Sequence, residues 1–102
     1  MFARVARFEG VNVEAAKATM AEAEAVIRPL MEGLAGYAGH IDLMSGDGQV
    51  ISITLFDSEE NARAGEATFD EEMPRKLGDL FASWQGRRVS VDRFEVVTDE
   101  RR

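Results

Sequence analysis

Several residue types that carry chemistry are scarce in this sequence: cysteine is absent, and histidine, tyrosine and tryptophan occur once each. Without cysteine, the chain cannot form disulfides, use a thiolate nucleophile or bind zinc or an iron–sulfur cluster through sulfur. The opening residues, MFARVARFEG, contain two arginines and no continuous apolar run, which is untypical of a signal peptide or a membrane span. We therefore expect a cytoplasmic protein with no membrane partner.

The sequence also lacks a basic stripe. Its formal net charge is −7 at pH 7, and its arginines are dispersed among carboxylates. We expect no nucleic-acid partner, because such partners are bound through clustered lysine and arginine. The 102 residues, 45% of them hydrophobic, suit one small globular domain, which we place at residues 1–98 with a polar tail at 99–102.

The first third of the chain predicts a strand followed by a long helix. FARVARFE, Phe2 to Glu9, mixes aromatic and β-branched residues and ends at a glycine, which is typical of a strand. Asn12 is a good helix N-cap, and the apolar residues that follow have helical spacing. We predict a helix from Val13 to Leu34, broken near Pro29.

The rest of the chain predicts a hairpin, a second helical region and a last strand. The β-rich runs YAGHIDLMS and QVISITLFD are separated by Gly46-Asp47-Gly48, a strong hairpin signal. Ser58 is then expected to cap a helix that is interrupted at Met73-Pro74 and stops near Gly86. RRVSVDRFEVV, residues 87–97, alternates well enough to form the last strand.

The resulting order, βαββαβ, is that of an α+β, ferredoxin-like domain with an antiparallel sheet and both helices on one face. The strands carry apolar residues on both sides, so the face without helices also needs cover. A second copy of the same sheet can cover this face with apolar residues of its own. We therefore predict a face-to-face homodimer that forms a dimeric α+β barrel.

With these elements placed, the chain resembles the antibiotic biosynthesis monooxygenase-like family of the dimeric α+β barrel superfamily. The resemblance is carried by FARVARFE, GLAGYAGHIDLM, ITLFDSEENARA and GRRVSVDRFEVV. It implies a pocket between sheet and helices and, in some members, oxygenation of small phenolic or polyketide-like aromatics without a cofactor. Haem-degrading relatives use an asparagine on the first strand and a histidine on the second helix, and this chain has neither.

The single histidine, His40, is the candidate catalytic base, with Asp42 as its partner. Strict strand alternation places both side chains on one face and Tyr37 on the other. A carboxylate two residues away could orient the imidazole to take a proton from a phenol, since imidazole changes charge near neutral pH. The alternative is a histidine that is hydrogen-bonded within a polar patch of the sheet or at the dimer interface.

An apolar and aromatic stretch around the Pro74 break is the candidate substrate-binding region. Trp84, Phe69 and Met73 lie at this break or at a helix end, where a cavity could open. The same residues have the spacing of a core stripe on an amphipathic helix, so both interpretations stay open.

Two arginines in the first strand, Arg4 and Arg7, fall on opposite faces. An arginine within a two-sided buried strand needs a carboxylate such as Asp92 or Glu95, or an anionic ligand, and Arg7 is the one we consider for substrate binding.

A metal site is not predicted. The sequence contains no HxH or HExxH motif, and the acidic pairs Glu59-Glu60 and Glu71-Glu72 fall on expected solvent faces. Two functions remain: a cofactor-free oxygenase of a small aromatic compound, or a non-catalytic homodimer that binds a small apolar molecule.

Overall fold

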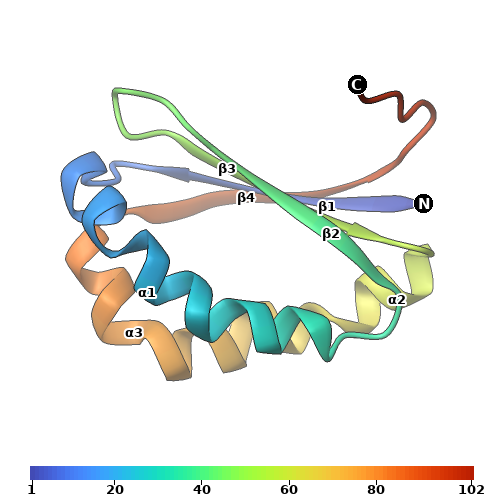
Figure 1. Cartoon of the computed structure of the whole chain (residues 1–102), viewed down its shortest axis with the longest axis horizontal. Helices are drawn as coiled ribbons and strands as arrows, with labels where there is room; N and C mark the ends of the chain where they lie inside the picture. The colour runs from blue at the N-terminus through green and yellow to red at the C-terminus, as the bar shows by residue number, and fades with distance from the viewer.

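A computed structural model describes all 102 residues, with a layer of helices covering one face of a sheet and nothing covering the other (Figure 1). The strands are β1 (Phe2–Glu9), β2 (Tyr37–Met44), β3 (Val50–Phe56) and β4 (Arg87–Glu95). They form one antiparallel sheet in the order β2-β3-β1-β4. The ferredoxin-like prediction is therefore confirmed, and residues beyond Glu95 belong to no helix or strand.

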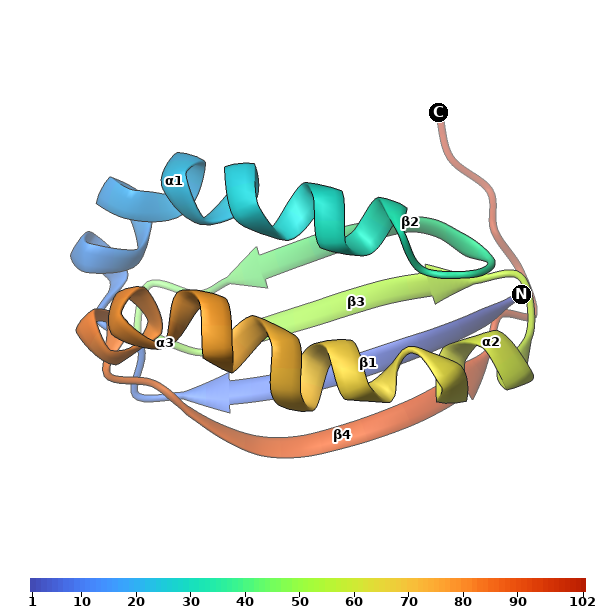
Figure 2. The ribbon, with the colours of Figure 1, turned by 90° about the horizontal axis from the view of Figure 1, so that it is seen from below.

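The helical layer divides between the two sides of the sheet. Helix α1 (Val13–Glu32) lies over the β2 side, whereas α2 (Glu59–Ala64), the π-helical turn η1 (Thr68–Glu72) and α3 (Met73–Trp84) run in succession over the β1 side (Figure 2). None of these helices is both long and apolar enough to cross a membrane.

Helix α1 begins where the sequence predicts, because the Asn12 side chain accepts a hydrogen bond from the Ala15 N–H at 3.1 Å. The predicted break near Pro29 is wrong, and the helix continues to Glu32. Pro29 is exposed and sits in the last turn, so its ring meets solvent and the missing N–H removes only one bond near the helix end. The Gly33 N–H then donates to the Pro29 carbonyl at 3.2 Å and closes the helix.

The second helical region is more irregular than predicted. Ser58 caps α2 as expected, accepting from the Asn61 N–H at 3.2 Å, and α3 begins at Met73 with Pro74 in its first turn. Between them, Gly65 interrupts the α-helical pattern and residues 68–72 form the π-helical turn. Wide turns of this kind are rare and often lie at functional sites.

The core lies between the helices and the sheet, and it is small. Only 14 of the 102 residues are buried, so many apolar side chains of the single chain stay accessible. Phe56 is the largest fully buried side chain, and alanines at 6, 16, 23 and 62 let the helices approach the sheet closely.

The other face of the sheet is apolar and uncovered. By strand register it carries Ile53 between Val5 and Ile41, and Ile51 between Arg7 and Leu43. Leu43 and Phe94 are 48% and 51% exposed. The remaining residues of this surface are Ala3, Leu55, Ser90 and Asp92. We call this surface the open face; Arg7 and Asp92 are its two charges.

Candidate functional site

His40 sits in an array of polar contacts on the helix-covered face of the sheet. Its Nδ1 lies 2.6 Å from the Tyr37 hydroxyl, and its Nε2 lies 3.5 Å from Oε1 of Glu24 on α1. The His40 and Glu24 side chains are 20% and 24% exposed. Both ring nitrogens therefore have a partner at a site that solvent only partly reaches.

A β-bulge brings Tyr37 into this array. Tyr37 pairs with Phe56 and Gly39 pairs with Leu55, so Ala38 is an extra residue on β2. The bulge reverses the alternation, and the prediction that Tyr37 points to the opposite face from His40 is wrong. Gly39 has a φ of +141°, a backbone conformation that residues with a side chain rarely adopt, which explains why the bulge forms at a glycine.

Glu24, and not Asp42, is the carboxylate that pairs with the His40 ring. Asp42 is exposed on the same face, where its Oδ1 accepts a hydrogen bond from the hydroxyl of Ser52 on the neighbouring strand. Sequence reasoning missed Glu24 because it is sixteen residues away on another element. The available signal was its place beside the buried Ala23, at the edge of the apolar stripe of α1.

The surroundings of the array favour a protonated Tyr37. Burial raises the pKa of Tyr37 above its ordinary value, and the carboxylates of Glu24 and Glu32 raise it further. A carboxylate 3.5 Å from Nε2 favours the tautomer with its proton on Nε2, which leaves Nδ1 to accept a hydrogen bond from the Tyr37 hydroxyl. In this arrangement a proton can pass from Tyr37 to His40, and Glu24 stabilises the imidazolium that forms.

Three residues of the same region have side chains that can bind a metal ion. Donor atoms of Glu24, His40 and Asp42 all lie within 4.8 Å of one another. A tetrahedral site with bonds of ~2 Å brings its donors to about 3.5 Å, and here His40 and Asp42 are already engaged by Tyr37 and Ser52. We assign no metal to the cluster.

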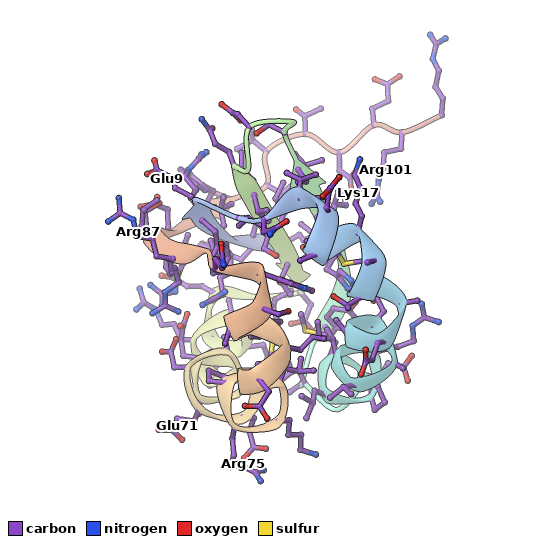
Figure 3. The ribbon with its side chains drawn as sticks, turned by 90° about the vertical axis from the view of Figure 1, so that its left-hand side faces the viewer. Glu9, Lys17, Glu71, Arg75, Arg87 and Arg101 are labelled. Atoms are coloured by element: carbon purple, nitrogen blue, oxygen red, sulfur yellow. The ribbon has the colours of Figure 1, made fainter.

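The acidic pairs lie on the helices, outside the core, and none of the four residues is buried. Glu71 and Arg75 project from the helical layer away from the sheet, whereas Glu9 and Arg87 lie together at the left of the view, beside the sheet (Figure 3).

The predicted substrate-binding residues do not gather around His40. The Trp84 indole N–H donates to the Thr19 hydroxyl at 2.7 Å and thereby ties the end of α3 to α1. Met73 is buried in the core, whereas Phe69 lies on η1 with the Arg4 guanidinium 4.0 Å above its ring. Arg7 is exposed on the open face. Their binding roles remain predictions.

The carboxylates near Arg4 come from the helical layer, and neither Asp92 nor Glu95 pairs with it. Glu66 lies 3.5 Å from its Nε and Asp70 lies 3.9 Å from its Nη2. Asp92 is opposite Val5 and therefore points to the open face, while Glu95 is opposite Phe2 at the strand end. The prediction of an ion pair at Arg4 is right in kind and wrong in its partners.

Two of the surface hollows lie at the helices and at the hairpin, and His40 lines neither of these two. A groove of about 610 Å³ runs between α1 and α3, lined by Glu22, Val26, Ser83 and residues 74–80. A second hollow of about 250 Å³ lies at the β2–β3 hairpin, against Leu43 and Ile51 of the open face. The hairpin hollow therefore borders the surface that a partner would cover.

The fold is shared with solved structures over almost the whole chain. A dimeric ferredoxin-like protein from an uncultured marine organism matches 100% of each chain with a TM-score of 0.71 and 16% identity. A candidate antibiotic biosynthesis monooxygenase from Bordetella bronchiseptica matches 95% of this chain and 97% of its own, with a TM-score of 0.68 and 17% identity. SnoaB, a cofactor-independent oxygenase from Streptomyces nogalater, matches 96% and 94%, with a TM-score of 0.61 and 13% identity.

These matches confirm, at the level of the fold, the resemblance to antibiotic biosynthesis monooxygenase-like proteins. No protein-family model and no curated protein matches the sequence.

Proposed function

We propose that this chain is the subunit of a cytoplasmic, homodimeric, cofactor-independent oxygenase that acts on a small phenolic or polyketide-like aromatic compound. The observation that carries the proposal is the Tyr37–His40–Glu24 array, a proton-accepting device on a fold shared with a cofactor-independent oxygenase. Fold alone does not define activity, so the chemistry has to come from these residues.

In the proposed reaction the array acts as the base. The substrate gives a proton to the Tyr37 oxygen while Tyr37 passes its own proton to Nδ1 of His40, and Glu24 stabilises the imidazolium. Asp42, held by Ser52, adds negative charge on the same face. The resulting carbanion gives electrons to dioxygen, and oxygen adds to the same carbon. For a methylene carbon, one oxygen atom becomes the carbonyl of the product and the other leaves as water.

The proposed dimer covers the open face of each sheet with that of a second copy. A contiguous apolar surface is unusual on a monomer and typical of an interface. Arg7 and Asp92 have no ion-pair partner within the chain, and a two-fold interface can bring Arg7 of one copy to Asp92 of the other. We therefore consider Arg7 an interface residue, and Phe69, Met73 and Trp84 remain the candidates for substrate contact.

A second candidate function is a non-catalytic homodimer that binds a small apolar molecule. It is favoured by one observation: both ring nitrogens of His40 are already engaged, so neither is free to take a proton directly from a ligand.

Oxygen uptake with anthrone- and hydroquinone-type phenols distinguishes the two. The wild type is expected to consume oxygen, and His40→Ala and Tyr37→Phe each to lower kcat by about 100-fold or more. Glu59→Gln, on the exposed end of α2, is the matched control and should keep full activity. A compound that raises Tm without any oxygen uptake would support the binding function instead, and turnover that survives His40→Ala would exclude the array as the base.

A further inference from the structure

Arg4 is a buried arginine, and two of its three guanidinium nitrogens have no hydrogen-bond partner. Its side chain is 3% exposed, on the helix-covered face of the central strand β1, between Thr54 of β3 and Arg93 of β4. No acceptor lies within hydrogen-bonding geometry of its Nε or Nη2. Buried polar groups are almost always bonded, so an arginine in this state requires an explanation.

The two nearest carboxylates are already used by other arginines. Glu66, 3.5 Å from Nε of Arg4, accepts a hydrogen bond from Arg93, and Asp70, 3.9 Å from Nη2, accepts one from Arg88 at 2.8 Å. Three guanidinium groups therefore share two carboxylates. Nε of Arg93 is also buried without a partner. We call these five residues, together with Phe69, the Arg4 cluster.

The cluster has one more arginine than carboxylates, and its central cation, Arg4, is poorly solvated. Burial lowers the pKa of Arg4, and Glu66 and Asp70 only partly oppose this effect. The Phe69 ring covers one face of the guanidinium at 4.0 Å, which leaves the edge as its route to an acceptor. A buried cation of this kind is unfavourable unless an anion bonds to it closely.

The unbonded atoms match an anion that presents two oxygens side by side. Nε and Nη2 form a single edge of the guanidinium, whose N–H groups are parallel and fit the two oxygens of one carboxylate. We propose that the Arg4 cluster binds the carboxylate of a small organic acid at this edge, with Phe69 against the ligand-bearing guanidinium. One carboxylate also balances the one excess charge.

Asp70 is the side chain that the ligand displaces from this site. Its side chain is 45% exposed and its partner Arg88 is 44% exposed, so the pair can swing outward without disrupting the core. Asp70 and Phe69 both lie on the π-helical turn η1, whose wide geometry departs from the α-helices on either side. An incoming carboxylate replaces Asp70 beside Arg4, and Asp70 keeps its bond to Arg88.

The Arg4 cluster is distinct from the His40 array. Thr54 pairs with Arg4 on one side and His40 on the other, so the two are separated by two strand spacings, about 10 Å. The carboxylate site needs no turnover, and its test therefore succeeds or fails independently of the oxygenase proposal.

The test titrates the full chain with sodium benzoate while NMR follows the arginine Nε–H signals. Benzamide is the neutral control of the same shape, and phosphate and chloride at matched ionic strength are the anion controls. We expect saturable shifts of the Arg4 and Arg93 signals with benzoate and none with benzamide or chloride. Absence of a saturable benzoate shift, or equal binding of phosphate, would overturn the carboxylate assignment.

Two variants test the geometry. Arg4→Lys keeps the charge and loses the two-atom edge, so it should weaken benzoate binding about tenfold, whereas Arg87→Gln at the exposed strand end should not. Because Arg4→Lys can also perturb folding, Asp70→Asn provides the second test on an exposed residue. It removes the competing carboxylate and should tighten benzoate binding several-fold; weaker binding would contradict the proposal.

Discussion

The two faces of the sheet are built from the same strands but differ in whether their charged residues have partners. On the helix-covered face, the charged residues lie close to groups from other elements, as His40 does to Glu24 on α1 and Arg4 to Glu66 beside η1. On the open face, Arg7 and Asp92 stand among exposed apolar side chains without an ion-pair partner. This difference is what we expect if one face carries the proposed chemistry and the other forms the proposed dimer interface.

The largest expected difference between the faces is in folding stability. Phe56→Ala removes the one large side chain that is 0% exposed and should lower the free energy of unfolding by about 3–5 kcal/mol. Leu43→Ala, at a site 48% exposed on the open face, should change the stability of the monomer by less than about 1 kcal/mol. Denaturant unfolding of dilute protein measures both, and equal losses would remove the distinction.

A charge placed on the open face should break the dimer. Leu43→Asp would bury an unpaired carboxylate in the interface and raise the dimer dissociation constant about 100-fold or more. Ala21→Asp, exposed on α1, is the matched control. Light scattering after size-exclusion chromatography should show the first variant as a monomer and the second unchanged; a Leu43→Asp dimer would exclude this face as the interface.

Substitutions of Arg7 and Asp92 should have a smaller effect on the dimer. Arg7→Asp or Asp92→Arg alone should weaken the dimer about tenfold, because each places like charges in the interface. The double exchange should restore association, as expected if each residue meets the other across the two-fold axis. Additive weakening in the double variant would show that the two residues do not pair.

The sequence predicts most of the fold because its signals are local. Helix caps at Asn12 and Ser58 and the Gly46-Asp47-Gly48 turn act within a few residues, and each is confirmed. The π-helical turn was missed because nothing in TFDEE distinguishes it from an α-helix. The helix break at Pro29 was wrongly predicted because a proline disturbs a helix less near its end, and the sequence pattern did not place that end.

The candidate site was less predictable because its partners meet through tertiary structure. Glu24 reaches His40 only because α1 lies over β2, and Tyr37 reaches it only because the bulge at Gly39 shifts the alternation. Arg4 was expected to pair within the sheet, yet its neighbours come from the α2-to-α3 segment above it. Residue types were thus readable from the sequence, whereas their pairing depended on how the layers pack.

The smallest expected effect is spectroscopic and uses the only tyrosine of the chain. Alkaline titration of its absorbance should have a midpoint above the ordinary pKa of 10.0, because burial and Glu24 oppose ionisation of Tyr37. Glu24→Gln should lower the midpoint and still leave it above 10.0, since burial is the larger cause. A wild-type midpoint at or below 10.0 would contradict the enclosed array.

The direction of the accompanying stability change follows from the raised pKa of Tyr37. The protonated form is favoured in the folded state, so this stabilisation is fully present below the unfolded pKa of about 10 and is lost as pH rises through the higher folded pKa. Tyr37→Phe should therefore reduce the fall of Tm above pH 10, and an unchanged alkaline fall would assign it to other groups.

Sedimentation equilibrium of the wild-type chain at micromolar concentration tests most directly whether the open face is built for assembly. We expect a species of twice the 11.3 kDa chain mass, which shifts to the monomer in Leu43→Asp. A single species at 11.3 kDa across the concentration range would contradict it.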